Sequence, residues 1–173
     1  NDWVKVWEGT LSHGISTWGG LKTHNNKFRD YVFFSEYAPL GADSHAYMSA
    51  DGGATFSIIY TTSGHVHIHD IAYDEYSGRI WIALGEYTSD KLIYSQDLGQ
   101  TWVTALDTGF QATVIIPFSR YIVLGSDYTP VGVYRFDKEK EKLEYIKNGD
   151  SNNAGEIAFI NELGTTAANS FCY

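Results

Sequence analysis

A nine-residue segment that occurs three times limits the possible folds of this chain more than any other feature. Its copies begin with an arginine, continue through four or five apolar β-forming residues and end with a carboxylate followed by a tyrosine; they are Arg29–Tyr37, Arg79–Tyr87 and Arg120–Tyr128. Because the central run is apolar throughout, it is typical of a strand that is buried on both faces. Copies that start 50 residues (29 to 79) and then 41 residues (79 to 120) apart indicate an architecture of repeated units.

The bulk composition fits many short strands joined by tight turns. Aromatic residues make up 16% of the 173 residues, and the chain has 17 glycines but only 3 prolines, which argues against disorder. The formal net charge of -9 disfavours binding to nucleic-acid phosphates or to an anionic membrane surface, because such contacts depend on lysine and arginine. No apolar run has the length of a membrane span, and no signal peptide is visible at Asn1. The single cysteine, Cys172, excludes an intramolecular disulfide and a multi-cysteine metal site.

A second motif, Ser-x-Asp-x-Gly-x-Thr followed by an aromatic residue, occurs twice. Its residues are Ser49, Asp51, Gly53, Thr55 and Phe56 in the first copy, and Ser95, Asp97, Gly99, Thr101 and Trp102 in the second. We expect the aspartate to accept backbone N–H bonds within a turn and the glycine to supply a left-handed backbone conformation. The threonine begins the next strand, and the aromatic ring packs against a neighbour. These residues are therefore assigned to turn stabilisation rather than to a metal or ligand site.

The two octapeptides resemble Asp-box (BNR) repeats, which occur in sialidases, in related β-propellers and in some phage tail proteins. The resemblance implies an all-β fold, a β-propeller built from four-stranded antiparallel blades. A third position, Tyr134–Asp137, aligns with the start of the motif but continues with four charged residues. We interpret it as a degenerate copy.

The two motifs together divide a single domain into blades of four strands. Whole blades are predicted at about 11–60, 61–107 and 108–150, and partial blades at 1–10 and 151–173. In the first blade, the first strand is predicted at Ser12–Trp18; Asp2–Glu8 matches a fourth strand and Gly155–Ile160 a first strand. Because a propeller needs roughly four or more blades to close, we expect the chain to belong to a larger propeller or to an oligomeric assembly.

The acid–tyrosine pairs that close the repeated segments are candidates for ligand binding. They are Glu36 with Tyr37, Glu86 with Tyr87, and Asp127 with Tyr128. The resemblance implies that the loops they open lie on the face where propellers usually bind ligands, opposite the Asp boxes. Carboxylates that accept bonds from sugar hydroxyls, beside aromatic rings that stack on sugars, are typical of carbohydrate recognition. The structural alternative is that each acid bonds to loop amides while each tyrosine packs between blades.

Alternating histidines followed by an aspartate form the most unusual short stretch, with His65, His67 and Asp70 as further candidates. On a strand, alternate side chains share one face about 6.5 to 7 Å apart. Such histidines can contact a ligand, act as acid or base, or supply two ligands to zinc. Only His65 and His67 are metal candidates, and no cofactor is predicted. Packing between blades remains the alternative.

The repeated arginines, Arg29, Arg79 and Arg120, are assigned to the scaffold. The resemblance to sialidases suggests a carboxylate-binding arginine triad, but an identical register in each repeat favours one structural role. The Arg-Ile-Pro or Arg-Leu-Pro motif usual near the start of sialidases is absent from the sequence. Without an arginine clamp, a substrate carboxylate has no bidentate partner, so we do not expect sialidase activity from these residues.

Three functions remain open at this point. The preferred hypothesis is a non-catalytic glycan-binding propeller, such as a phage tail adhesin that recognises host surface sugars, located outside the cell or on a virion surface; a cytoplasmic location is not excluded by the sequence. The first alternative is a glycoside hydrolase or lyase that uses paired carboxylates, Asp70 with Glu86 or Glu36. The second is a propeller that binds proteins.

Overall fold

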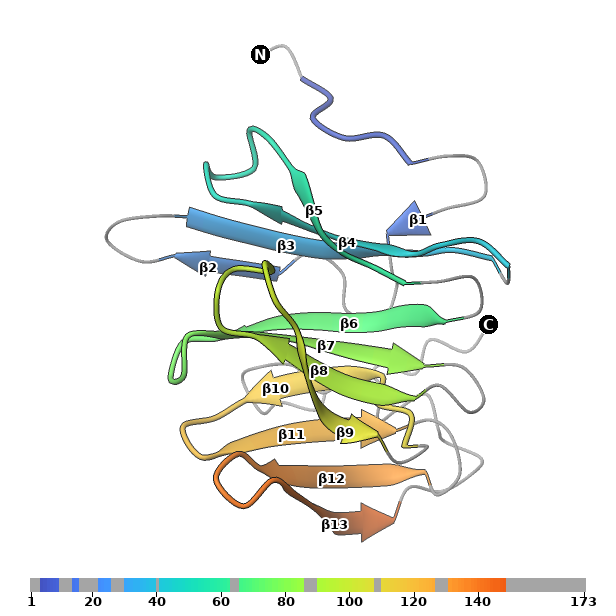
Figure 1. The fold of residues 1–173 in the computed structure, drawn as a ribbon, viewed down its shortest axis with the longest axis vertical. Coiled ribbons are helices and arrows are strands. Elements are labelled where there is room, and N and C mark those ends of the chain that lie inside the picture. Colours follow the sequence, from blue (N-terminus) through green and yellow to red (C-terminus); the bar gives the residue numbers. More distant parts are fainter. Residues whose placement is uncertain are drawn as a thin grey trace.

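A computed structural model describes residues 4–9, 14–15, 22–25, 30–39, 41–62, 66–85, 90–107, 110–126 and 131–148. These residues form strands and turns, with no helix among them. The strands make three antiparallel sheets (Figure 1). The predicted all-β class is therefore confirmed for the part of the chain that the structure describes.

The second and third sheets are four-stranded meanders whose strands pair in chain order. The second sheet contains β6 (His67–Asp74), β7 (Arg79–Gly85), β8 (Lys91–Ser95) and β9 (Val103–Asp107). The third contains β10 (Val114–Pro117), β11 (Tyr121–Ser126), β12 (Gly132–Asp137) and β13 (Lys142–Asn148). These eight strands lie within the four-stranded units predicted at about 61–107 and 108–150.

The first sheet follows the prediction in three strands but differs at its first one. The confirmed strands are β3 (Asp30–Tyr37), β4 (His45–Ser49) and β5 (Ser57–Thr61). The free edge of β3 carries two short strands, β1 (Gly14–Ile15) opposite its end and β2 (Lys22–Asn25) opposite its beginning. The single strand predicted at Ser12–Trp18 missed β2. The sequence Lys-Thr-His-Asn has no apolar alternation, so its strand conformation depends on pairing with β3.

The segment before the first sheet is positioned by an aromatic contact rather than by strand pairing. The alternation of Asp2–Glu8 predicts a strand, yet the described residues 4–9 belong to none. Instead, the Trp7 ring packs edge-on against Phe34 at 5.0 Å and against Tyr47 at 5.8 Å between ring centroids. The strand predicted at Gly155–Ile160, like all of residues 151–173, lies outside the described residues.

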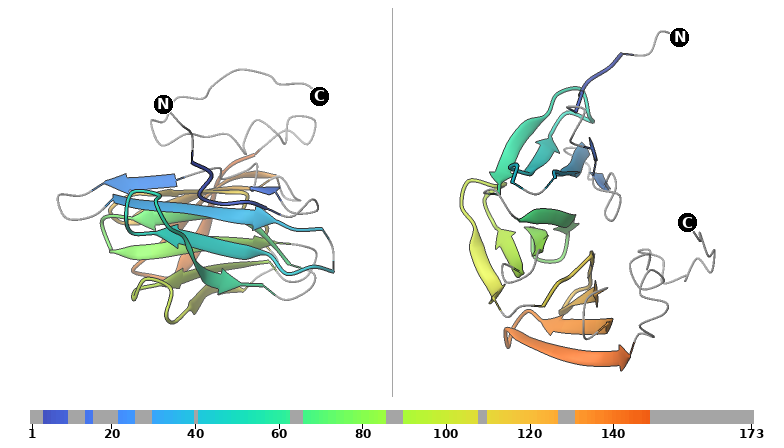
Figure 2. Two further views of the ribbon diagram at one scale, coloured as in Figure 1. Left: turned by 90° about the horizontal axis from the view of Figure 1, so that it is seen from above. Right: turned by 90° about the vertical axis from the view of Figure 1, so that its right-hand side faces the viewer.

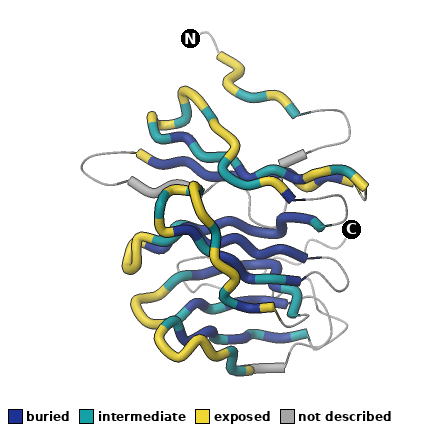
Figure 3. Tube along the Cα trace, viewed as in Figure 1, coloured by how far each residue is buried: buried dark blue, intermediate teal, exposed yellow. Residues whose placement is uncertain are grey.

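The three sheets stack face to face and fan out from one another (Figure 2). Strand β6 contacts β3 of the first sheet on one side and β10 of the third sheet on the other. The apolar core consists of two seams, both visible as buried strands in Figure 3. The first seam, between the first and second sheets, contains Phe33 and Ile82; the second seam, between the second and third sheets, contains Trp81 and Phe136. Each sheet therefore buries its apolar side chains against the next sheet.

The third copy of the repeated segment is one residue out of phase with the second. The gapless alignment equates Ile122 with Trp81, and Trp81 points from β7 into the second seam. Ile122 lies in that same seam, and its cross-strand partner Phe136 packs edge-on against Trp81 at 6.0 Å. Ile122 therefore points back toward the second sheet, whereas Trp81 points forward. A slip of one residue moves every side chain to the other face of a sheet. Two copies whose arginines align in the sequence can therefore direct corresponding side chains to opposite faces.

The two edges of the fan carry different connections (Figure 1). The hairpins β4–β5, β8–β9 and β12–β13 turn at one edge, named here the hairpin edge. Strands β3, β7 and β11 end at the opposite edge, named the loop edge, with Tyr37, Gly85 and Ser126. Glu36 and Tyr37 therefore belong to the loop edge, and both Ser-x-Asp motifs belong to the hairpin edge.

Candidate functional site

Glu36 and Tyr37, the described acid–tyrosine pair, point to opposite faces of the first sheet. Side chains alternate along a strand, and the Tyr37 ring stacks on His67 of the second sheet at 4.2 Å between centroids and 8° between planes. On the far face, the Tyr47 hydroxyl donates a hydrogen bond of 3.0 Å to Glu36 Oε1. The two side chains therefore serve different faces of the sheet, and ligand binding by either of them stays a prediction.

Glu36 is instead part of an aromatic cluster on the far face of the first sheet. Its side chain is buried, and Tyr47 stacks on Phe34 with 4.7 Å between centroids, next to Trp7. Burial, followed by the neighbouring Glu36 carboxylate, raises the pKa of the Tyr47 phenol above its ordinary value. Tyr47 thus remains protonated at neutral pH and supplies a hydrogen bond that a buried carboxylate requires.

Three nearly parallel rings, those of Tyr37, His67 and His69, form a triangular cluster at the loop edge, where Tyr37 and His69 lie 6.4 Å apart. Tyr37 stacks on His67, and the rings of His67 and His69 lie 6.5 Å apart at 16°. The two histidine rings are nearly parallel even though the β6–β7 pairing has a bulge between Ile68 and Asp70. Tyr37 is 37% exposed, whereas His67 is 5% exposed and His69 2%. Of these three rings, only Tyr37 has a substantial exposed surface.

His69 is held in one position by its surroundings. Its Nδ1 lies 3.1 Å from the carbonyl oxygen of Ala112, to which the Nδ1–H form donates. Its ring also occupies space that only a glycine at position 85 leaves, because a Cβ on Gly85 would be 2.5 Å from His69 Cε1. Burial lowers the pKa of His69 to about 4. A neutral, fixed imidazole of this kind fits the packing interpretation of the histidine stretch.

Asp70 links the second and third sheets instead of facing a ligand. The residue is fully buried; its Oδ1 accepts the N–H of Ile71 and its Oδ2 the N–H of Ile115 on β10, both at 2.8 Å. This position corrects the interpretation of Asp70 as a binding or catalytic residue. Asp70 and Glu36 serve different interfaces, so they do not form a pair of catalytic carboxylates.

Five candidate residues lie outside the described residues, so their roles stay predictions: His65, Glu86, Tyr87, Asp127 and Tyr128. Among the described residues, no three His, Cys, Asp or Glu side chains gather closely enough to hold a metal ion. The same part of the chain contains no helix that is long and apolar enough to cross a membrane.

The first motif, Ser49–Phe56, folds into a compact turn, named the first turn. Asp51 Oδ1 accepts the Ser49 hydroxyl at 2.6 Å and the Thr55 N–H at 2.9 Å, and Oδ2 accepts the Thr55 hydroxyl at 2.7 Å. Ser49 Oγ accepts the N–H of Gly53 at 2.8 Å, and Gly53 has the expected left-handed backbone with φ of 91°. The Phe56 ring packs edge-on against Phe34 of its own sheet at 5.1 Å.

The second motif, Ser95–Trp102, repeats these bonds in the second turn. Asp97 accepts the Ser95 hydroxyl at 2.8 Å, the Thr101 N–H at 2.8 Å and the Thr101 hydroxyl at 2.6 Å. The hydroxyl and amide bonds lower the pKa of both aspartates to about 2, with Ser49 as the largest cause for Asp51 and Thr101 for Asp97. Both carboxylates are therefore engaged in the turn hydrogen bonds that the sequence predicts.

The degenerate third hairpin still has an aspartate in its turn, Asp137, and adds a link between sheets. Lys138 has only 7% of its side chain exposed, and its Nζ donates to Asp74 Oδ2 and to the carbonyl of Phe118, both at 2.7 Å. Asp137 accepts the N–H of Glu139 at 3.0 Å, which closes the turn. Sequence reasoning missed Lys138; the only signal was a lysine where the other copies have turn-forming residues.

The repeated arginines Arg79 and Arg120 both hold the hairpin-edge end of their own sheet, with different partners. The Arg79 guanidinium lies 4.2 Å from the Tyr94 ring centroid, and the Gln96 amide oxygen, when turned toward it, accepts from Arg79 Nε and Nη2 at 3.1 and 3.3 Å. Arg120 donates to Asp137 Oδ2 from Nε and Nη2 at 3.2 and 2.9 Å. Both arginines make contacts within the fold, but Arg79 and Arg120 do so with different kinds of partner.

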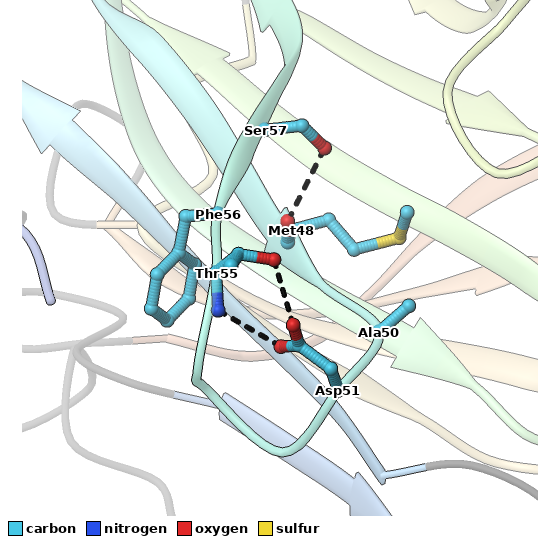
Figure 4. Close-up of a pocket in the computed structure, with 6 residues that line it drawn as sticks. All are labelled: Met48, Ala50, Asp51, Thr55, Phe56 and Ser57. Atoms are coloured by element: carbon cyan, nitrogen blue, oxygen red, sulfur yellow. Dashed lines mark hydrogen bonds between the residues drawn. The ribbon is translucent and has the colours of Figure 1, made fainter.

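A hollow of about 220 Å³ lies beside the first turn (Figure 4). It is lined by Met48, Ala50, Asp51, Thr55, Phe56 and Ser57. In the view of Figure 4, the side chains of Met48 and Ala50 point to one side of the hairpin and the Phe56 ring to the other. Sequence reasoning did not predict this hollow, although all six lining residues belong to the β4–β5 hairpin.

The sequence matches no protein-family model, and no curated protein matches it at a significant level.

Proposed function

We propose that this chain contributes three blades of a β-propeller that binds carbohydrate at its loop edge. Support for the blades comes from three antiparallel meanders that stack face to face in chain order, with apolar seams between them. A repeated four-stranded unit of this kind is the building block of propellers. The resemblance of the first and second turns to Asp boxes supports the same architecture.

The observation that carries the binding proposal is the exposed Tyr37 ring, held flat against His67. Tyrosine binds sugars through its apolar ring face or rim and its hydroxyl. Because Tyr37 is already fixed by stacking at 4.2 Å, little side-chain entropy is lost when a ligand contacts it. Strands β7 and β11 end at the same edge, so the residues that follow them in the sequence, Glu86, Tyr87, Asp127 and Tyr128, remain proposed contributors.

The enzyme alternative has less support among the described residues. A glycoside hydrolase needs two carboxyl groups about 5 to 10 Å apart around one bond. Of the described candidates, Asp70 is used in the second seam and Glu36 on the far face of the first sheet. A virion adhesin or another surface lectin fits the proposal better, and a propeller that binds proteins remains the second alternative.

The test is glycan binding by a Tyr37→Ala variant, measured on a glycan array and by calorimetry with the best array ligand. Loss of one aromatic contact of about 1 kcal/mol or more predicts affinity that is at least about fivefold weaker. Tyr76→Ala is the matched control, because Tyr76 is 58% exposed but lies in the β6–β7 turn at the hairpin edge.

Two results would contradict the proposal. Unchanged glycan binding in Tyr37→Ala, with weakened binding in Tyr76→Ala, would move the site away from the loop edge. Release of free sugar by the wild-type protein would favour the hydrolase or lyase instead.

A further inference from the structure

The first turn contains the only aspartate of the sequence that is followed by a glycine, Asp51 with Gly52. Both residues are exposed in the β4–β5 hairpin. In the second turn the corresponding residues are Asp97 and Leu98. Leu98 has a left-handed backbone like that of Gly52, with φ of 58° against 72°. The two turns therefore share a backbone shape and differ in the side chain that follows the aspartate.

An aspartate side chain can react with the backbone nitrogen of the next residue. In this turn, the Gly52 nitrogen bonds to Asp51 Cγ, the carboxyl hydroxyl leaves with the amide hydrogen as water, and a five-membered succinimide ring forms. Water then cleaves the bond between the Asp51 main-chain carbonyl and this nitrogen, so that the chain continues through the side chain as isoaspartate. Glycine favours the ring closure, because it has no Cβ to hinder the close approach of the backbone.

In the closed first turn, hydrogen bonds hold both reacting groups. The Asp51 carboxylate accepts the Ser49 hydroxyl and both the N–H and the hydroxyl of Thr55, toward which it points in Figure 4. The N–H of the residue before Thr55 adds a further bond. The Gly52 N–H donates to the carbonyl oxygen of Asp30 at 3.1 Å. Because both groups are engaged, the reaction requires a local opening of the turn.

The ionisation of Asp51 also slows the reaction in the closed turn. The hydrogen bonds, with that from Ser49 as the largest cause, lower the pKa of Asp51 to about 2. The carboxylic acid form, whose hydroxyl can leave as water, is therefore scarce at neutral pH. The same bonds that build the turn thus restrain both the position and the protonation of the reacting carboxyl group.

We propose that Asp51 is a site of spontaneous isoaspartate formation that is controlled by the opening of the first turn. The modification adds one carbon atom to the main chain between Asp51 and Gly52 and moves the carboxylate to a branch at Cα. The paired bonds to Thr55 are then lost, while the second turn keeps its own. The reaction needs only water and is independent of carbohydrate binding at the loop edge.

The test is prolonged incubation of the folded protein at mildly acidic pH and body temperature. Isoaspartate is then labelled with an isoaspartyl methyltransferase, and each labelled residue is located by peptide mapping. Mapping is needed because Asn148, which precedes Gly149 in the sequence, forms isoaspartate by the related loss of ammonia. We expect label at Asp51 and none at Asp97.

Exchanging the residues that follow the two aspartates tests the role of glycine. Gly52→Leu copies the second turn and should abolish the label at Asp51; a Cβ at this position has no neighbouring atom closer than 3.9 Å, so the hairpin has room for it. Leu98→Gly should make Asp97 a second site. Label should accumulate there more slowly than at Asp51, because Trp102 holds the second turn against the first sheet.

A further variant tests the role of turn opening. Thr55→Ala removes the hydroxyl bond to Asp51 and should speed isoaspartate formation about fivefold, the increase in the open population expected when one hydrogen bond is lost. Hydrogen exchange of the backbone amide at position 55 measures the opening directly. Thr101→Ala removes the same bond from the second turn and should leave the rate at Asp51 unchanged.

Three outcomes would overturn the proposal. The first is no label at Asp51 in the wild type and in Thr55→Ala, over a time in which a peptide of residues 49–56 becomes labelled. Equal labelling of Asp51 and Asp97 in the wild type would remove the role of Gly52. Equal rates in the wild type and Thr55→Ala, with faster amide exchange in the variant, would show that opening does not control the reaction.

Discussion

The first and second turns have the same internal structure but very different surroundings. Each has a serine, an aspartate and a threonine joined by the same bonds, and each glycine has a φ close to 90°. The second turn is seated against the first sheet: Trp102 Nε1 donates to the carbonyl of Ile59 at 3.1 Å. The first turn contacts its own sheet through Phe56. Local sequence therefore determines the turn, whereas the neighbouring sheet determines what the turn contributes to stability.

Replacing the turn glycines should separate the two turns most strongly. Gly53→Ala and Gly99→Ala each force a left-handed backbone on alanine, which costs about 1 kcal/mol. A Cβ on Gly99 would also lie 2.6 Å from Ile59 Cβ, whereas the nearest atoms to one on Gly53 are 3.9 Å away. Overpacking adds about 1 to 3 kcal/mol, so urea unfolding should show a loss of about 3 kcal/mol for Gly99→Ala and about 1 for Gly53→Ala. Equal losses of unfolding free energy in the two variants would mean that Ile59 of the first sheet does not restrict the space at Gly99.

Mild acid should weaken the interior of the second sheet while both turns stay intact. His69 has a folded pKa of about 4 against an unfolded value of 6.5, so the unfolded state binds more protons between these values. Stability must then fall as the pH drops from 6.5 to 4, by up to about 3 kcal/mol. The measurement is the free energy of unfolding at several pH values, with His69→Asn as a variant that lacks this titration. If His69→Asn retains the full decrease, another group is responsible.

The aromatic residue of each turn offers a smaller test. Trp102→Phe removes the N–H that donates to the Ile59 carbonyl. The loss of this hydrogen bond should lower the free energy of unfolding by about 1 kcal/mol. Phe56→Trp places the same indole in the first turn, where the ring packs on Phe34 of its own sheet; we expect a change within about 0.5 kcal/mol. Thermal unfolding of both variants checks the difference. A stabilised Phe56→Trp variant would indicate an acceptor beside the first turn as well.

The smallest difference is expected from the two aspartates. Asp51 and Asp97 both have a folded pKa of about 2, below the ordinary value of 3.8. Each contributes stability that is present above pH 3.8 and is lost as the pH falls toward 2. Asp51→Asn and Asp97→Asn should therefore reduce the acid-dependent loss of stability by equal amounts. Unfolding followed by circular dichroism at pH 2 to 5 measures this loss. Unequal amounts would show that surroundings, rather than the turn alone, set the aspartate pKa.

The sequence predicted the elements that depend on local patterns. The apolar run of Arg79–Gly85 gave β7 with the same bounds, and the octapeptide chemistry gave both turns with their hydrogen bonds. It failed where position depends on a partner. Strand β2 has no pattern of its own, and Trp7 packs on two rings without joining a strand. The opposite directions of Glu36 and Tyr37 follow from strand alternation alone, so that part of the candidate site was predictable.

What the sequence determined by itself is the repeat: strands, turns and their order, because these follow from residue periodicity and from bonds within a few residues. Only the tertiary structure decided which face each side chain serves. The contact of Phe136 with Trp81 showed the phase of the third sheet, and the seating of Asp70 against Ile115 removed it from the ligand site. The physical reason is that sheets are held to one another by contacts between distant residues, and one residue of slip exchanges the two faces.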